Sequence, residues 1–164
     1  MCVVLVLGID PGSRYTGYGV VRKQGRDLIY VASGRVNAAK AGELPDRLPV
    51  IYEAMQQLLG EFEPDVAALE SVFFAKNAMS SLKLGHARGV SMLACQLADV
   101  SVHEYAPATV KQAVAGHGRA DKSEVLQMVK MTLEIEGDLA EDAADALAVA
   151  ICHCQSSGFA DRLG

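Results

Sequence analysis

The sequence has no hydrophobic run long enough to cross a membrane. A transmembrane helix needs about 20 consecutive apolar residues, and the apolar run at the N-terminus is interrupted by Gly8 and Asp10. This run also lacks the basic leader and the small-residue cleavage site of a signal peptide. We therefore expect a cytoplasmic protein without a membrane segment, whose N-terminus folds as a buried strand.

Paired cysteines are also missing. The four cysteines show no disulfide framework and would stay reduced in the cytoplasm: Cys2, Cys95, Cys152 and Cys154. The triplet Cys152-His153-Cys154 resembles a fragment of a zinc site. On a helix, however, side chains two residues apart diverge, and no second ligand pair follows. We interpret these residues as ordinary helix positions.

Positive charge is scarce, because the formal net charge is -5. This balance speaks against a nucleic-acid partner, since phosphate contacts draw on Lys and Arg. The charge is unevenly distributed, however. Between Ser71 and Lys130 the basic residues outnumber the acidic ones, so the remainder of the chain is strongly acidic. A basic face on an acidic protein is therefore possible, although charge runs are more often plain solvated surface.

The chain shows no internal repeat, low-complexity tract or second domain. Its 164 residues, of which 51% are hydrophobic, fit one globular domain. Hydrophobic periodicity predicts strands over 3–9, 18–22, 28–32, 66–69 and 100–103, with 34–37 extending the third strand or forming another. It predicts helices over 46–62, 78–98, 108–114, 121–134 and 141–154. We expect an α/β fold with a five-stranded mixed sheet flanked by helices over residues 1–155, and a frayed tail over 156–164.

Two of these helices carry specific expectations. Asp121 is placed to cap the helix over 121–134, with Glu124 at its third position. The helix over 78–98 has an apolar stripe that we expect to face the core, and we expect His86, which lies on it, to be packed and hydrogen-bonded. The stripe comprises Met79, Leu82, His86, Val90, Leu93 and Leu97.

Four acidic residues occupy positions that look buried. Asp10 ends the first apolar strand, Glu70 ends the strand over 66–69, and Asp142 and Asp145 interrupt an alanine-rich helix. The carboxyl ends of parallel strands gather functional groups, and residues three apart on a helix share a face. If the last helix lies across the sheet, the four carboxylates meet. Each acid alone could instead be a turn, strand-end or helix-surface residue, since carboxylates are mostly exposed.

Clustered carboxylates call for a divalent cation. Their mutual repulsion raises pKa values, and Mg2+ or Mn2+ relieves it with oxygen ligation. Two such ions suit phosphoryl transfer, in which one activates water and the other stabilises the leaving oxygen. The acids therefore point to metal-dependent phosphodiester hydrolysis.

Longer motifs around these acids resemble the RuvC family of bacterial Holliday-junction resolvases. The resemblance runs from Val4 to about Cys154 and rests on GIDPGSR at 8–14, TGYG at 16–19, ESVFFAKN at 70–77, LGHARG at 84–89 and DAADALA at 142–148. It implies a ribonuclease-H-like fold. It also implies a homodimer that nicks two opposed strands of a four-way DNA junction symmetrically, in recombination and DNA repair. The cuts would leave 5′-phosphate and 3′-hydroxyl ends.

The resemblance also implies roles for individual residues and partners. Asp10, Glu70, Asp142 and Asp145 would be catalytic and bind two Mg2+ ions, with Mn2+ as a substitute. Lys111 and Lys122 would support activity, and Phe73 would contact unpaired bases, although lysines on helices can simply face solvent. Weaker candidates for DNA contacts are Lys76, Lys83, Arg88 and Arg119. RuvA and RuvB, the branch-migration proteins of the family, are the expected partners.

Two features separate this chain from some family members. It lacks a basic C-terminal extension, and its overall charge is acidic. Both suggest weaker non-specific DNA binding.

Two other classes remain open on the residues alone. A sugar-kinase or actin-like ATPase shares the Asp-Pro-Gly-Ser turn before a hairpin, but it needs a second domain and a second phosphate loop. A non-cleaving junction-binding or RNA-processing relative is expected to lack some of the four acids, which are all present here.

Overall fold

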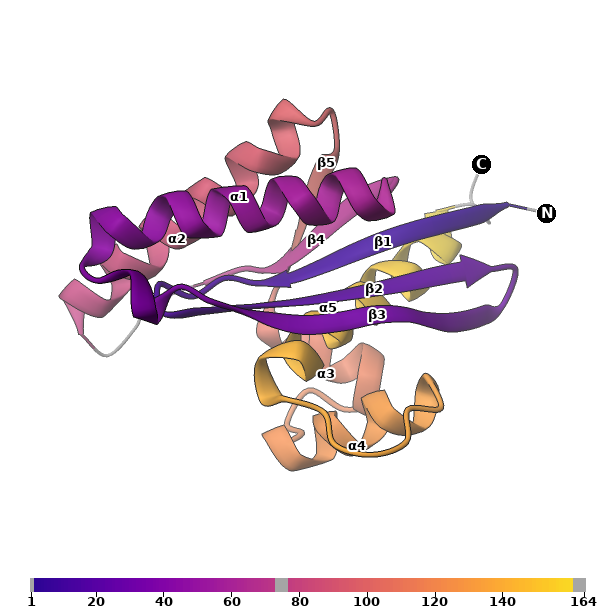
Figure 1. Cartoon of the computed structure of the whole chain (residues 1–164). Helices are drawn as coiled ribbons and strands as arrows, with labels where there is room; N and C mark the ends of the chain where they lie inside the picture. Colours follow the sequence, from indigo (N-terminus) through magenta and orange to yellow (C-terminus); the bar gives the residue numbers. More distant parts are fainter. Residues whose placement is uncertain (1, 73–76, 161–164) are drawn as a thin grey trace.

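The computed structural model describes residues 2–72 and 77–160 (Figure 1). The strands are β1 (Val3–Asp10), β2 (Tyr15–Gln24), β3 (Asp27–Asn37), β4 (Val66–Glu70) and β5 (Ser101–Tyr105). The helices are α1 (Leu44–Phe62), α2 (Ala78–Leu97), α3 (Pro107–Ala115), α4 (Lys122–Thr132) and α5 (Glu141–Ala160), with a short 3-10 turn, η1 (Ala39–Ala41), before α1. The predicted elements and their order are confirmed.

The differences from the sequence prediction lie mostly at the ends of elements. β3 is continuous to Asn37, so residues 34–37 extend the hairpin arm and form no separate strand. α5 continues to Ala160, past the predicted helix end at residue 154. The predicted capping of α4 is confirmed, because the Asp121 side chain accepts a hydrogen bond from the Glu124 N–H and Glu124 accepts one from the Asp121 N–H, both at 2.8 Å.

The five strands form one mixed sheet in the order β3-β2-β1-β4-β5. β1 pairs antiparallel with β2 and parallel with β4, while β4 pairs parallel with β5. The predicted mixed sheet is therefore confirmed. Its parallel half brings the carboxyl ends of β1, β4 and β5 to one edge.

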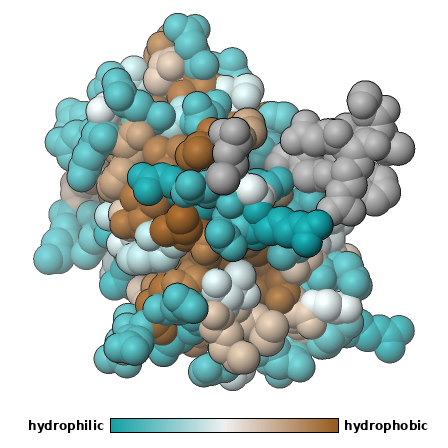
Figure 2. Space-filling model, turned by 90° about the vertical axis from the view of Figure 1, so that its right-hand side faces the viewer, coloured by the Kyte–Doolittle hydropathy of each residue, from teal (hydrophilic) through white to brown (hydrophobic). Residues whose placement is uncertain are grey.

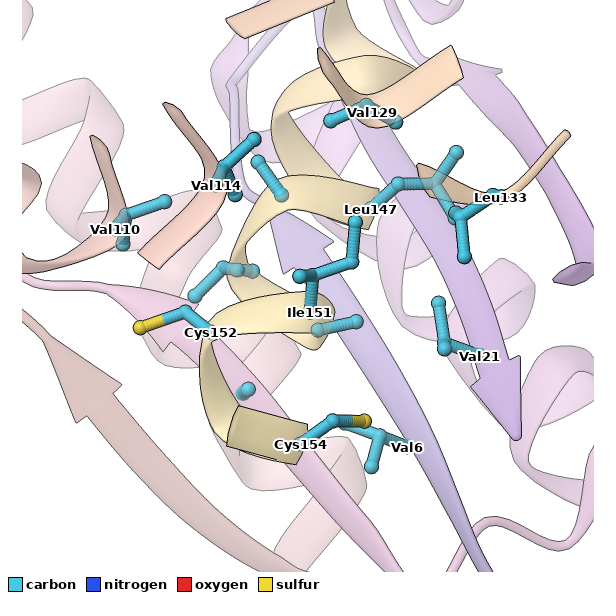
Figure 3. Close-up of a cluster of buried hydrophobic side chains, with 14 of the residues drawn as sticks. Val6, Val21, Val110, Val114, Val129, Leu133, Leu147, Ile151, Cys152 and Cys154 are labelled. Carbon is cyan, nitrogen blue, oxygen red and sulfur yellow. The ribbon is translucent and has the colours of Figure 1, made fainter. Parts of the chain in front are cut away.

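Helices cover both faces of the sheet. Figure 1 shows α1 and α2 on one side and α3, α4 and α5 on the other. Because side chains alternate along a strand, Leu7 and Ile9 of β1 pack in the cluster that contains α1 and α2 residues. Val6 packs in the opposite cluster, with Val21 of β2 and residues of α3, α4 and α5 (Figure 3). The even-numbered positions of β1 thus face α5.

The thiols divide between the surface and the two clusters. Cys2 is exposed, whereas Cys95 is buried beside α1, and Cys152 and Cys154 are buried on α5 (Figure 3). Burial raises the pKa of both Cys95 and Cys154 to about 11. His153 lies between Cys152 and Cys154 in the sequence, and its ring nitrogen Nδ1 is 2.6 Å from the Tyr105 hydroxyl. Each residue of this triplet is therefore packed within the protein.

The predicted inward stripe of α2 is wrong except at Val90, which is partly buried and packs against the core cluster that contains α1 residues. Met79, Leu82, Leu93 and Leu97 are 53–65% exposed, and His86 is also exposed, with its Nδ1 2.6 Å from the Leu82 carbonyl oxygen. The buried face of α2 instead carries small side chains: Ala87, Ser91, Ala94 and Cys95. Small residues let α2 lie close to its neighbours, while Met79, Leu82, Leu93 and Leu97 point outward.

Two observations describe the molecular surface. Among the described residues, no helix is long and apolar enough to span a membrane. Figure 2 views the molecule from the right-hand side of Figure 1 and shows apolar surface broken up by hydrophilic side chains.

Candidate active site

Strand pairing places Asp10 and Glu70 side by side. β1 and β4 run parallel, with Ile9 paired to Leu69, so the last residues of both strands reach the same edge of the sheet. Both acids lie at even-numbered positions, on the face that α5 covers. The register of β1 and β4 therefore brings these two acids together at the sheet edge, as expected.

Glycines on β1 and β2 let α5 approach the sheet closely. A Cβ at Gly8 would lie 1.9 Å from the carbonyl oxygen of Ala146, and one at Gly17 would lie 2.1 Å from that of Asp142. Any side chain at these positions would collide with the α5 backbone. The two glycines therefore set the depth of the helix that carries Asp142 and Asp145.

A cavity of about 310 Å³ opens between these elements. Asp10, Glu70 and Asp145 line it, together with Lys111 of α3 and Lys122 of α4. Asp142 does not line this cavity, and its carboxylate lies 3.6 Å from the guanidinium of Arg35 on β3. The structure thus brings three of the four predicted acids and both predicted lysines around one space, with the fourth acid paired beside it.

The carboxylates in this cavity hold their protons more tightly than usual. Burial, followed by repulsion from Asp145, Asp142 and Glu70, raises the pKa of Asp10 to about 7. Burial and repulsion from Asp145 also raise the pKa of Glu70, while Lys111, Lys122 and Arg88 act in the opposite direction. Burial and the neighbouring carboxylates therefore disfavour ionisation of Asp10 and Glu70 more than the nearby basic side chains favour it.

Asp145 follows the same pattern as its neighbours. Burial raises its pKa, Lys122 opposes the change, and Glu141 and Asp142 add to it. The repulsion among Asp10, Glu70, Asp142 and Asp145 places all four within one electrostatic environment. Such an arrangement favours a bound cation.

The two lysines occupy different environments. Lys111 is half-buried against the cavity, whereas Lys122 is 75% exposed and its Nζ lies 2.7 Å from Glu141 Oε1. The hydrogen bond with Glu141 raises the pKa of Lys122, and Asp145 and Asp10 contribute in the same direction. Both lysines line the cavity beside the acids, where a phosphate would meet them.

Arg88 is bound within the protein. Its Nη1 donates a hydrogen bond of 2.6 Å to the backbone carbonyl of Glu70, and its Nη2 donates to the Glu104 carboxylate. Sequence reasoning placed Arg88 among the weaker DNA contacts and overlooked the Glu70 contact. No sequence pattern signals this contact, because it joins α2 to the end of β4, which are separate along the chain.

Two further predicted DNA contacts, Lys83 and Arg119, are not among the residues that line the cavity. Lys83 and Arg119 are exposed, on α2 and just before α4 respectively. Phe73 and Lys76 lie outside the described residues. Arg35, which no sequence motif singled out, lies over the ring of Tyr15 at 4.2 Å from its centroid, as well as beside Asp142.

The acids supply oxygen donors of the kind that Mg2+ and Mn2+ prefer. Within residues 2–72 and 77–160, however, no three His, Cys, Asp or Glu side chains form a ready-made ligand group. The donor chemistry of Asp10, Glu70 and Asp145, and the charge they leave unbalanced, fit a divalent cation.

Comparison with known proteins identifies the family. The family model for crossover junction endodeoxyribonuclease RuvC matches residues 6–153. The chain belongs to the RuvC family. A relative of the same name from Geobacter sp. strain M21 is 48% identical, with 98% of each chain covered. Another, from Vibrio cholerae O395, is 52% identical over 93% of this chain and 88% of the relative.

A solved structure supports the same assignment. The RuvC of T. thermophilus, in a complex with Holliday junction substrate, is similar with a TM-score of 0.90 and 33% identity, over 96% of both chains. The predicted ribonuclease-H-like α/β fold and the family resemblance are therefore confirmed. The match over most of the chain also decides against the sugar-kinase or actin-like ATPase.

Proposed function

We propose that this chain resolves Holliday junctions by nicking two opposed strands symmetrically, leaving 5′-phosphate and 3′-hydroxyl ends, in homologous recombination and DNA repair. Membership of a family of crossover junction endodeoxyribonucleases supports the reaction class. The observation that carries the assignment to residues is the cavity where Asp10, Glu70 and Asp145 meet Lys111 and Lys122. Asp142, close enough to raise the pKa of Asp10, completes the set.

The four acids would hold divalent cations, with two Mg2+ ions per site and Mn2+ as a substitute. The pKa of about 7 at Asp10 supports this proposal, because burial and then repulsion from Asp145, Asp142 and Glu70 raise it, and a bound cation would relieve that repulsion. When bound, the cations supply Lewis acidity toward a phosphodiester and a more acidic water. Asp10, Glu70, Asp142 and Asp145 would hold these ions at the sheet edge.

The lysines would act on the scissile phosphate. Lys111 is half-buried and lines the cavity, so it is placed to balance charge that develops on phosphate oxygens. Lys122 is exposed at the first turn of α4, so it would exchange Glu141 for a phosphate when DNA binds. Both are proposed catalytic residues in this sense.

DNA binding would extend beyond the cavity. Lys83 and Arg119 are exposed cations placed to contact the phosphate backbone. Phe73 and Lys76, which follow Glu70 in sequence, are proposed as contacts to an unpaired base and to phosphate, with base stacking worth about 1 to 3 kcal/mol.

A homodimer would provide two equivalent sites for two symmetric cuts. The exposed stripe of α2 supports a dimer surface: Met79, Leu82, His86, Leu93 and Leu97 follow each other at spacings of three, four and seven residues. This spacing suits two helices packed along a common seam. We propose that α2 meets its copy in a second protomer.

The wider setting is inferred from the family. We infer a cytoplasmic enzyme that acts on junctions handled by RuvA and RuvB. Residues 1–155 are proposed as the nuclease domain and 156–164 as its C-terminal segment, of which 156–160 continue α5.

A junction-cleavage assay tests the proposed function. The purified protein is expected to nick a synthetic four-way junction in Mg2+ at symmetric positions, and Asp10→Asn is expected to bind the junction but not cut it. The amide keeps the size of the side chain and removes its charge. Cleavage retained by Asp10→Asn would reject the catalytic role, and preference for linear duplex would reject the resolvase activity.

A further inference from the structure

We infer that Arg88 is a positioning residue for the reaction, which fixes the end of β4 and with it the carboxylate of Glu70. The inference rests on the proposed role of Glu70 in the site. It assigns Arg88 to holding the catalytic strand in place and removes it from the DNA contacts.

The geometry of Arg88 is that of a clamp inside the protein. The side chain is only 13% exposed, although it carries a permanent charge. One guanidinium nitrogen donates to the Glu70 carbonyl oxygen at 2.6 Å, and another donates to the carboxylate of Glu104. A planar guanidinium holds two such acceptors in one fixed orientation, which a lysine cannot reproduce.

The clamp joins three elements at the edge that carries the acids. Glu70 is the last residue of β4, Glu104 lies near the end of β5, and Arg88 comes from α2. At the next residue of the chain, Ser71 N–H and Oγ both donate to the Tyr105 carbonyl oxygen of β5, at 2.8 and 3.2 Å. The end of β4 is thus held by α2 through Arg88 and by β5 through Tyr105, next to Glu70.

Loss of the clamp would act on the site through backbone position. A displacement of about 1 Å at a catalytic group is enough to cost about 100-fold in rate. A phosphate contact has a different signature, because its loss weakens DNA binding and leaves the bound complex competent. The inward direction of both Arg88 donors favours the first of these effects.

Glu104 provides a test that separates the two roles. If Arg88 served DNA, Glu104→Gln would free the guanidinium and remove a negative charge, so junction binding would tighten. If Arg88 serves Glu70, Glu104→Gln loosens the clamp and lowers the cleavage rate in the same direction as Arg88→Gln.

The experiment compares Arg88→Gln, Arg88→Lys and Glu104→Gln with Arg26→Gln, which changes an exposed arginine in the β2–β3 turn. Junction affinity is measured without Mg2+, and cleavage as a single-turnover rate at saturating protein. Mn2+ affinity is measured by electron paramagnetic resonance on the free protein. Thermal unfolding checks that each variant is folded.

We expect Arg88→Gln to keep its junction affinity within about two-fold, while its single-turnover rate and Mn2+ affinity fall about 10- to 100-fold, as for other losses of supporting contacts around metal ligands. Arg88→Lys should recover part of the rate, Glu104→Gln should lose a smaller part, and Arg26→Gln should match the unsubstituted protein.

Weakened junction affinity in Arg88→Gln, with an unchanged saturated rate and unchanged Mn2+ affinity, would overturn the inference. If Arg88→Gln does not fold, Glu104→Gln decides: tighter junction binding with an unchanged rate overturns the inference, and a lower rate supports it. Failure of the proposed function is distinguishable, since the unsubstituted protein would then not cut at all.

Discussion

Asp10 combines burial with repulsion from three other acids, and this combination has a consequence for stability. In the folded protein without metal, Asp10 has a pKa of about 7, against 3.8 for an unperturbed aspartate. Between these values the folded state binds more protons than the unfolded chain. The free energy of unfolding must therefore fall as pH rises from about 4 to about 7.

The first prediction concerns this pH dependence. In EDTA, Asp10→Asn should be more stable than the unsubstituted protein at pH 8, by on the order of 2 to 4 kcal/mol, and the difference should shrink toward pH 4. Urea unfolding at a series of pH values measures it. Glu53→Gln, an exposed position on α1, is the control. Equal pH dependence in Asp10→Asn and the unsubstituted protein would contradict the pKa shift.

Two residues of the site show what a sequence can and cannot predict. The strand endings identified Asp10 and Glu70, because apolar runs and side-chain alternation are local properties. The pairing of Asp142 with Arg35 and the bonds of Arg88 to Glu70 and Glu104 were not predictable, since each joins residues from different elements. Local periodicity carries no information about such partners.

At the scale of elements, the position of α5 over the sheet depends on glycines in the strands that it covers. Gly8 and Gly17 face main-chain oxygens of α5, which cannot move aside as a flexible side chain can. The position of Asp142 and Asp145 over the sheet therefore depends on two residues that have no chemistry of their own.

The second prediction compares glycine substitutions. Gly8→Ala should lower the free energy of unfolding by about 3 kcal/mol through overpacking, and should reduce cleavage because α5 must shift. Gly60→Ala, in α1 with nothing within 4 Å of the added Cβ, should instead raise it by about 0.5 to 1 kcal/mol. Thermal or urea unfolding with a cleavage assay measures both. Equal effects of the two substitutions would show that α5 has room to accommodate a side chain.

α2 is the element whose buried face was predicted incorrectly from the sequence. Its periodicity predicted the helix, and the larger apolar residues were expected to face inward. The inner face carries Ala87, Ser91, Ala94 and Cys95 instead, at spacings that also form a helical stripe. α2 therefore carries two stripes at helical spacing, one of larger apolar residues and one of small residues. Which stripe is buried depends on the space between α2 and its neighbours, and a sequence pattern does not reveal that space.

At the scale of the whole molecule, an acidic protein that acts on DNA needs its cations concentrated. Lys111 and Lys122 lie beside the acids. Lys83 and Arg119 are exposed and belong to the same basic stretch of the sequence, residues 71–130. The sequence outside residues 71–130 carries the excess negative charge. Binding is then directed to one region and weakened elsewhere.

The third prediction concerns assembly. The double substitution Leu82→Glu with Leu93→Glu should convert the proposed dimer to monomer at micromolar concentration, because burying each of these two leucines would contribute about 1.5 to 3 kcal/mol. Met131→Glu, at a 70% exposed position on α4, should leave the dimer intact. Light scattering after gel filtration measures the mass. A dimer that survives the double substitution would place the interface elsewhere, and a monomeric unsubstituted protein would reject dimerisation.

The burial of three of the four thiols leaves one exposed cysteine for labelling with a thiol-reactive dye. Cys2 is exposed at the start of β1, while burial raises the pKa of Cys95, Cys152 and Cys154 and keeps them from forming thiolate. A maleimide dye should therefore react at Cys2 of the unsubstituted protein. Energy transfer between dyes on two protomers would then report their separation while a junction is bound and cut.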